Sequence, residues 1–578
     1  MGNRFVEYLT RFYTGSATHA GVFDEYNMQN REYDGLLHAC TDVERDVLGL
    51  FRHPVPPTVI LTGNAGDGKT RIAREVIESL SKQALTDWGD TGKPYQLEMP
   101  QYILRVVQDL SDYGKSAAEG VLGGIGGSAE ESGKPLVYLV AANEGKLRDS
   151  MPESFRFEEE IKEQIKHGRN LQNRSVVAFN LNLERTSLFV TPMLRQMTAP
   201  ELWSECASCH GCSRCPIRLN AERMANVHVQ RQMTSLYRIV EQSGFHITMR
   251  DMLIHLTHAM VGTEPCRSVL THAADVDAAP WRHVYYENCW ASEQPEEYRR
   301  LLAVVNRLDM LEVGQKSVFE IDSFILHGGQ TDAEIAAYER LFADQLDLGG
   351  DMFRRKRGSY LAGQGKEEPE QQHDVLQWLP HCRRKLFFEW EDPRVNHLMA
   401  LQTVEEFNEF VEAEEDWDLI DRALPRLVCG LNRALTGVYL DETTASQNLY
   451  VTSQYHGAVP DVVPIINDRI PTSDLKLDRY PQNNSDRLYL KSERLEGVGL
   501  EVDLLLYEYL VRLAEGGTHN VLAEQCELRL RTFKDQLLGR VGLAPVRVDT
   551  RRLEFFVETG GQHRLMKLLV HNGKVKVQ

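Results

Sequence analysis

Short runs of apolar residues with the length of buried β-strands recur through the first third of the chain. They cover residues 58–62, 102–107, 136–140 and 175–179. Stretches with helical spacing of apolar positions alternate with them, which predicts a parallel sheet that helices cover on both faces. Ligands of such sheets bind beside the carboxyl ends of the strands. We therefore expect an α/β fold with a site at that edge.

The first of these strands runs directly into a segment with the full G-x4-G-K-[ST] pattern of a phosphate-binding loop. Its residues are Gly63, Asn64, Ala65, Gly66, Asp67, Gly68, Lys69 and Thr70. The glycines let backbone N–H groups point at phosphate oxygens, and a helix predicted from about residue 69 to 80 presents its positive end to the same anion. Lys69 would bridge the β- and γ-phosphates, and Thr70 would hold Mg²⁺. The pattern predicts an ATP-binding, AAA+-like P-loop NTPase sheet.

Changes of pattern along the 578 residues divide the chain into six expected segments. They are an N-terminal helical lead-in (1–52), the P-loop NTPase core (53–200), a cysteine-rich metal site (201–220), a helical lid (221–330), a mainly helical domain with basic patches (331–480) and a small α+β module (481–578). The lid is predicted from apolar spacing of 3.6 residues across 236–262. We expect the C-terminal half to be mixed but mainly helical, with a strand at 546–549 in the last segment.

ATP hydrolysis needs an acidic group near Mg²⁺, a carboxylate that orients the attacking water and a polar group that senses the γ-phosphate. Two assignments fit the strands. In the first, Asp109 ends the second strand as the magnesium-side acid, and Asn143 ends the third strand as the sensor. In the second, Asn143 stands where an aspartate is usual and Glu144 orients the water. Asn180 or Asn182 is then the sensor, and we prefer this assignment because it gives the usual strand count between loop and base.

Arginines close to the expected nucleotide would complete the site. Arg250 lies near the first turn of a predicted helix and resembles the second sensor arginine of an AAA+ lid. Arg148, Arg174 and Arg185 are candidates for an arginine finger, and the sequence does not rank them. Because Asn143 carries no charge for the metal, we expect hydrolysis to be slow or to depend on a partner.

Four of the ten cysteines lie within ten residues, at Cys206, Cys209, Cys212 and Cys215. Their C-x2-C-x2-C-x2-C spacing predicts a metal site. We favour structural Zn²⁺, which takes four thiolates in a closed tetrahedron. A [4Fe–4S] cluster is the alternative, because the run resembles a ferredoxin pattern ending in Cys-Pro but is one residue short in its last gap. The other six cysteines are scattered, which is typical of reduced thiols.

A net charge of −19 argues against a uniformly basic nucleic-acid binder. Two basic segments, 353–357 and 381–390, nevertheless place Arg and Lys beside aromatic residues, which suits phosphate contact and base stacking. The alternatives are a solvated charged loop for the first segment and an amphipathic core segment for the second. We find no run of 18 uncharged apolar residues and no signal-peptide pattern, so we expect no membrane contact and a cytoplasmic location.

Four features together resemble the DptF family, the ATPase-like component of bacterial DNA phosphorothioation-dependent restriction. They are the phosphate loop, the Asn-Glu-Gly-Lys-Leu turn at 143–147, Cys-Pro-Ile-Arg-Leu-Asn at 215–220 and Arg-Arg-Lys-Leu-Phe-Phe at 383–388. The resemblance implies an anti-phage complex with DptG- and DptH-like partners that restricts DNA lacking the sulfur modification. We then expect nucleotide state to control assembly of the complex or its action on DNA, which is contacted directly or through partners. An oligomer is compatible with this class, and a nucleotide-gated scaffold or sensor with little hydrolysis is the alternative function.

Overall fold

The computed structural model of this chain falls into two compact units. The first comprises Met1–Glu241, His246–Ala400 and Gln482–Asn484, and the second comprises Gln242–Phe245, Leu401–Pro481 and Ser485–Gln578. The residues that the structure describes are 2–12, 35–90, 92–128, 133–153, 155–167, 175–263, 265–266, 268–269, 279–363, 375–412, 417–452, 465–479, 486–517, 524–543, 552–559 and 562–577. None of the helices within these ranges is long and apolar enough to cross a membrane.

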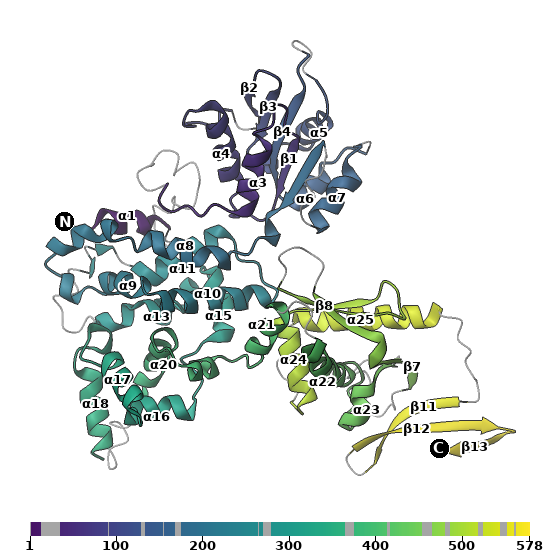
Figure 1. Cartoon of the computed structure of the whole chain (residues 1–578). Coiled ribbons are helices and arrows are strands. Elements are labelled where there is room, and N and C mark those ends of the chain that lie inside the picture. Colours follow the sequence, from purple (N-terminus) through teal and green to yellow (C-terminus); the bar gives the residue numbers. More distant parts are fainter. Residues whose placement is uncertain are drawn as a thin grey trace. The chain divides into compact units, whose positions relative to one another are not determined.

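A five-stranded sheet in the order β2-β3-β4-β1-β5 organises the first 180 residues (Figure 1). Its strands are β1 (Thr58–Thr62), β2 (Tyr95–Glu98), β3 (Ile103–Val107), β4 (Leu136–Ala142) and β5 (Val176–Asn180). Strand β1 pairs in parallel with β4 and β5, and β3 pairs in parallel with β4. In this register Thr62 lies opposite both Ala142 and Asn180, so three strands end at the same level. The predicted mostly parallel sheet is confirmed.

Strand β2 was not predicted from the apolar pattern. It has four residues, pairs antiparallel with β3 at the edge of the sheet, and alternates between half-buried and exposed positions. A strand this short with one wet face carries too few apolar residues to be recognised by periodicity.

Helices cover both faces of the sheet because side chains of successive residues in β1 point to opposite sides. Val59 and Leu61 belong to an apolar cluster with residues of α3 (Asp42–Leu50) and α4 (Lys69–Ser81). Ile60 belongs to a second cluster, with residues of α5 (Lys115–Gly123), α6 (Glu144–Asp149) and α7 (Glu158–His167). The central strands are therefore buried on both sides, as an α/β fold requires.

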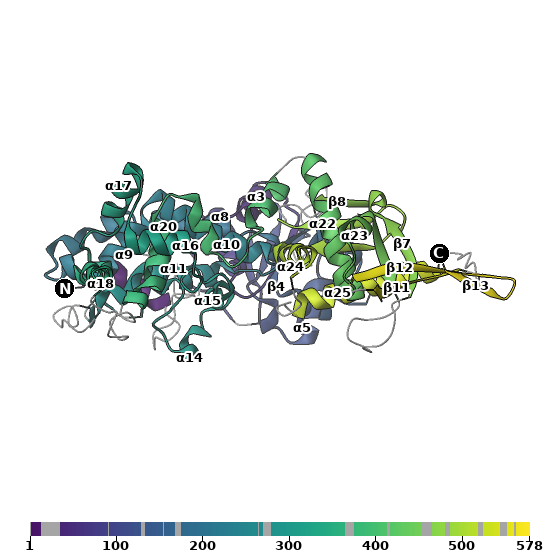
Figure 2. The same cartoon turned by 90° about the horizontal axis from the view of Figure 1, so that it is seen from below.

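Most of the described chain between β5 and Ala400 is helical (Figures 1 and 2). The main helices here are α8 (Ser187–Met197), α9 (Pro216–Met224), α10 (Val227–Gln242), α11 (Met249–Val261), α13 (Tyr285–Asn288), α14 (Glu296–Arg299), α15 (Ala303–Leu308), α16 (Phe319–His327), α17 (Asp332–Leu341), α18 (Met352–Leu361) and α20 (Trp378–Glu389), and α1 (Arg4–Leu9) lies in the N-terminal segment. The start of α11 is fixed by a capping box between Thr248 and Asp251.

The basic segment 353–357 lies on α18 and not in the loop that we expected. Gly358 alone does not break this helix, because a single interior glycine costs only about 1 kcal/mol and the surrounding residues are fair helix formers. Arg355 adds an ion pair to Asp351 one turn earlier, at 3.0 Å. Local propensity therefore decides the conformation of this segment.

The second unit combines helices with three small sheets. Its helices are α21 (Val404–Glu412), α22 (Trp417–Thr436), α23 (Glu442–Gln447), α24 (Leu504–Ala514) and α25 (Glu524–Leu543); its strands are β6 (Asn448–Thr452), β7 (Ile466–Pro471), β8 (Leu475–Arg479), β9 (Leu488–Ser492), β10 (Gly499–Val502), β11 (Arg552–Thr559), β12 (Gln562–His571) and β13 (Lys574–Val577). Gly430 lets α22 approach α24 closely, since a Cβ there would lie 2.1 Å from the Leu510 carbonyl oxygen. The strand expected at 546–549 lies outside the described residues.

Candidate nucleotide-binding site

The phosphate-loop motif joins β1 to α4 in a conformation that requires glycine. Gly66 and Gly68 have φ angles of 104° and 90°. A Cβ on Gly66 would also lie 2.8 Å from the Arg250 Cβ, so this position lacks both the conformation and the room for a side chain. The loop is consequently held against the start of α11 as well as between β1 and α4.

The Lys69 ammonium lies folded against its own loop. It donates hydrogen bonds to the carbonyl oxygens of Gly63 at 2.8 Å and Asn64 at 2.6 Å. Burial lowers the pKa of Lys69, and the nearby carboxylates of Asp67 and Asp109 act in the opposite direction. A half-buried cation between two acids and two carbonyl oxygens can exchange these partners for the oxygens of an anion.

A cavity of about 410 Å³ opens beside this loop. Its lining residues are Leu37, His38, Ala39, Thr41 and Glu44 around the start of α3, Ala65–Ile72 of the loop and α4, Gln108, Asp109 and Asp112 after β3, Met193 of α8, and Met249, Arg250 and Leu253 of α11. The charged residues beside the motif and the apolar residues at 37, 39, 193 and 253 give the cavity a polar and an apolar portion. A cavity of this size and mixed character suits a small organic anion.

Asp109 is the sequence-predicted acid that the structure brings to this cavity. It shares the lining with Lys69 and Thr70 and interacts electrostatically with Lys69. Its Oδ1 also accepts a hydrogen bond from the Ser111 N–H at 2.8 Å, which orients the carboxylate. The first of the two assignments thus places its acid beside the phosphate loop.

Glu144 does not line the cavity. It begins α6, its side chain is 39% exposed, and it forms an ion pair with Arg148 at 2.8 Å. Asn143 serves as the N-cap of the same helix, because its Oδ1 accepts from the Gly145 N–H at 2.9 Å. The structure therefore gives this turn local roles and does not bring Glu144 together with Lys69.

The two sensor candidates at the end of β5 have different surroundings. The Asn182 Oδ1 accepts from the Asn64 N–H of the phosphate loop at 3.0 Å. The Asn180 Nδ2 donates instead to the Ile165 carbonyl oxygen at 3.2 Å, and its Oδ1 accepts from the Asn182 N–H. Asn182 contacts the loop, whereas Asn180 supports the turn that presents it.

Two contacts tie the loop to the helical segment, and of their residues in that segment the sequence indicated Arg250 but not His246. The Arg250 N–H donates to the Gly66 carbonyl oxygen at 3.1 Å, and the His246 Nε2 lies 2.7 Å from the Asp67 Oδ1. The other Asp67 oxygen accepts from the Asn64 N–H at 2.5 Å. Asp67 occupies a position where the motif allows any residue, so only its acidity offered a signal.

Residues just before α3 also line the cavity, and no pattern in the sequence predicted this. The His38 N–H donates to the Gln196 Oε1 at 3.0 Å, and the Gln196 Nε2 donates back to the His38 carbonyl oxygen at 2.7 Å. The His38 ring lies 2.9 Å from the Glu44 carboxylate. These contacts hold residues 37–44 in place at the apolar portion of the cavity.

Glu241 near the end of α10 carries a half-buried carboxyl close to the same region. Burial raises its pKa to about 7, while hydrogen bonds from Ser187 and the charges of Arg185 and His246 oppose the rise. The Ser187 N–H and hydroxyl donate to the two Glu241 oxygens at 3.0 and 2.5 Å. Of the other arginine-finger candidates, Arg148 pairs with Glu144, and Arg174 lies outside the described residues.

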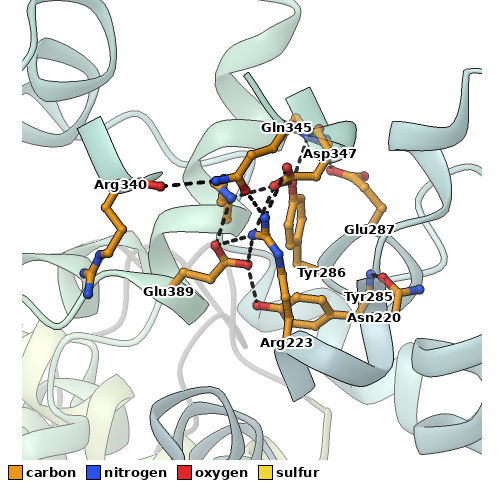
Figure 3. Close-up of polar contacts among 11 residues, drawn as sticks. Asn220, Arg223, Tyr285, Tyr286, Glu287, Arg340, Gln345, Asp347 and Glu389 are labelled. Atoms are coloured by element: carbon orange, nitrogen blue, oxygen red, sulfur yellow. Dashed lines mark hydrogen bonds and ion pairs between the residues drawn. The ribbon is translucent and has the colours of Figure 1, made fainter. Parts of the chain in front are cut away.

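The second basic segment forms the buried helix α20 and presents no basic surface. Arg383 pairs with Asp322, Arg384 with Glu287 and Glu312, and Lys385 with Asp347 and Glu389, all at 2.5–2.8 Å. Figure 3 shows Arg223 of α9 joining the same network through Asp347, Gln345 and Glu389. The core-segment interpretation therefore describes 381–390, and its three cations are not available to nucleic acid.

The four clustered cysteines lie on short 3₁₀ turns before α9. Cys206 is in the turn Pro200–Ser208, Cys212 begins the turn Cys212–Arg214, and Cys215 caps α9. Within the described part of the chain, no group of three or more His, Cys, Asp or Glu side chains is set to hold a metal ion. Metal binding at Cys206, Cys209, Cys212 and Cys215 stays a prediction.

Comparison of the chain with protein-family models, with curated proteins and with solved structures finds no match. The functional argument therefore rests on the residues and on their geometry.

Proposed function

We propose that the first unit binds ATP with Mg²⁺ as a nucleotide-dependent switch of the AAA+-like P-loop class. The observation that carries this proposal is the cavity in which Lys69, Thr70 and Asp109 meet Arg250. These residues come from the phosphate loop, the turn after β3 and the start of α11. Their types are those that phosphate and magnesium recognition require.

Each wall of the cavity has a role in this proposal. Loop N–H groups and Lys69 hold the phosphates, Thr70 and Asp109 hold Mg²⁺, and Arg250 contacts the terminal phosphate. Asn182 lies outside the cavity lining and supports the loop through the Asn64 N–H. The apolar side chains at 37, 39, 193 and 253 receive the base. Lys69 must release the carbonyl oxygens of Gly63 and Asn64 to meet the phosphates, so the loop rearranges on binding.

The contacts of the phosphate loop with Arg250 and His246 suggest how a change in bound nucleotide could alter the helical segment. A rearranged loop alters the Gly66 carbonyl that accepts from Arg250 and the Asp67 carboxylate that meets His246. Arg250 lies in the first turn of α11 and His246 lies three residues before this helix, which continues into the helical part of the same unit. Nucleotide state would thereby be passed from the sheet to the helices.

A scaffold or sensor with little hydrolysis is the second candidate, and one observation favours it. Glu144, the expected water-orienting base, is paired with Arg148 outside the cavity lining. Turnover would then be slow unless a partner supplies or repositions a base.

The biological setting that we propose follows from the sequence resemblance. The chain would be the ATPase-like component of a bacterial DNA-restriction complex with DptG- and DptH-like partners. Because α20 buries its cations in ion pairs, we assign DNA contact to the partners and not to this helix.

Binding of a fluorescent ATP analogue, with and without Mg²⁺, tests the nucleotide site. Lys69→Ala should weaken binding about 10- to 100-fold, since hydrogen bonds to a charged group contribute about 1.5–3 kcal/mol. Asp109→Asn should abolish most of the affinity that Mg²⁺ adds. Glu144→Gln is the matched control and should leave binding and the ATPase rate unchanged.

Two outcomes would contradict this assignment. Unchanged affinity in Lys69→Ala would remove the nucleotide site altogether. If Glu144→Gln traps bound ATP and Asp109→Asn leaves the effect of Mg²⁺ on affinity unchanged, Glu144 is the water-orienting base. The second of the two assignments, with Asn143 in place of the usual aspartate, would then be correct.

A further inference from the structure

A fifth cysteine, distant in sequence, lies beside the four-cysteine run. Cys266 interacts electrostatically with Cys206 and Cys209, and Cys215 interacts with both Cys206 and Cys266. Asn3 links two of these thiols directly. Its Nδ2 donates to the Cys206 Sγ at 3.4 Å, and its backbone N–H donates to the Cys266 sulfur.

Cys215 has the surroundings of a metal-bound sulfur. It caps the nine-residue helix α9, whose first N–H groups have no partner within the helix. Burial raises the pKa of the Cys215 thiol to about 11, and the nearby backbone N–H groups of Ile217 and Arg218 act in the opposite direction. N–H groups placed near a sulfur in this way offset the negative charge of a thiolate.

Cys212 has a different environment from its neighbours in the run. Its Sγ is contacted by the Arg218 guanidinium. The evenly spaced run therefore contains one thiol that already contacts a cation.

We propose that Cys206, Cys209, Cys215 and Cys266 bind one structural Zn²⁺ ion and that Cys212 lies outside this ligand set. Zn²⁺ favours a closed tetrahedron of four thiolates with bonds of about 2.3 Å, and a C-x2-C pair is a usual half of such a site. No preset group exists among the described residues, so the ion must draw the four sulfurs together, as metal binding coupled to folding does.

The charge of the site is compensated by its surroundings. Four thiolates around Zn²⁺ carry a net charge of about −2. The Asn3 Nδ2 already donates to the Cys206 sulfur, and the backbone N–H groups of Asn3, Ile217 and Arg218 act on the Cys266 and Cys215 thiols. The ion would join residues 2–4, the 206–215 segment and Cys266, three stretches that no local interaction in the sequence connects.

Elemental analysis of the purified full-length protein tests the ligand set. We expect about one Zn²⁺ per chain in the wild type and in Cys212→Ser, the matched control. Cys266→Ser should lose most of this zinc, and Cys266→His should regain it, because imidazole is also a zinc ligand. Circular dichroism of each variant shows whether the helices remain folded, and ATP binding measured alongside separates failure of this site from failure of the nucleotide site.

Five results would overturn the proposal. If Cys266→Ser retains zinc, or if Cys212→Ser loses it, the ligands are instead the four cysteines of the run, Cys206, Cys209, Cys212 and Cys215. Failure of Cys266→His to regain zinc would show that position 266 is not a ligand. Iron with visible absorption would replace zinc by a cluster, and a wild type without metal would remove the site.

Discussion

At the scale of single residues, neighbours decide which of several similar side chains acts at the site. Asp109 and Glu144 both follow strands of the sheet, yet Asp109 lies in the cavity beside Lys69 and Glu144 pairs with Arg148 on the surface of α6. Asn180 and Asn182 differ in the same way, since only Asn182 contacts the loop. Asn180 is the last residue of β5, whereas Asn182 lies in the 3₁₀ turn Leu181–Leu183 that follows, and this change of backbone conformation turns the two side chains toward different partners.

Glu241 leads to a prediction about pH. Its pKa is about 7 in the folded protein against an ordinary 4.5, so the folded state holds this proton more tightly than the unfolded state. Protonation of Glu241 therefore stabilises the folded state in full below about pH 4.5. This stabilisation amounts to at most about 3 kcal/mol of unfolding free energy, and it is lost as the pH rises through about 7. Glu241→Gln should remove this part of the pH dependence of thermal stability.

Thermal unfolding between pH 5 and 8 provides the measurement. Glu297→Gln is the control, because Glu297 is an exposed glutamate on α14 and its replacement should leave the wild-type profile unchanged. If Glu241→Gln follows the wild-type profile as well, Ser187 and Arg185 hold Glu241 ionised and the predicted linkage is absent.

At the scale of elements, α20 shows that a basic sequence can form the interior of a helical domain. Lys385 and Asp347 are both fully buried and form an ion pair, and Glu389 also pairs with Lys385. Arg223 contacts both Asp347 and Glu389 (Figure 3). Burial alone would raise the pKa of Asp347, but Lys385 and Arg223 lower it to about 2. The helix is held by a network in which two cations, Arg223 of α9 and Lys385 of α20, pair with the carboxylates of Asp347 and Glu389.

Lys385→Met should destabilise the first unit by about 3–5 kcal/mol, because it leaves the Asp347 carboxylate buried without its nearest cation. Arg355→Ala on α18 is the matched control. Its ion pair with Asp351 is exposed, so the change should stay within about 0.5 kcal/mol. Chemical denaturation followed by circular dichroism measures the unfolding free energy of both variants. Equal losses in the two variants would show that the buried ion pair of α20 stabilises the unit no more than the exposed pair does.

At the scale of the whole molecule, the candidate nucleotide site belongs to one of the two units. Its lining comes from five separate stretches, around residues 37–44, 65–72, 108–112, 193 and 249–253, and all of them lie in the first unit. A ligand that joins five stretches should stabilise the unit that contains them, in proportion to its affinity and concentration.

Hydrogen exchange with and without ATP and Mg²⁺ tests this localisation. We expect slower amide exchange in 58–72, 103–112 and 246–253, because these backbones surround the cavity. Helices α22 and α24 of the second unit should be unaffected in the direct comparison. Lys69→Ala should abolish the protection, whereas equal protection in both units would contradict a site confined to the first.

By itself, the sequence determined the local features of this protein. Apolar runs indicated β1, β3, β4 and β5 to within about two residues, and the glycine and lysine pattern located the turn into α4. These features are decided by neighbouring residues, through strand periodicity, glycine conformation and helix propensity.

The tertiary structure alone decided which distant groups meet. It brought Asp109 to Lys69, His246 to Asp67 and Cys266 to the cysteine run, and it buried the cations of α20 among acids from other elements. Residues separated by tens or hundreds of positions become neighbours only when sheet and helices pack. Their proximity follows from the balance of burial, charge pairing and chain connectivity over a whole unit, which no local pattern contains.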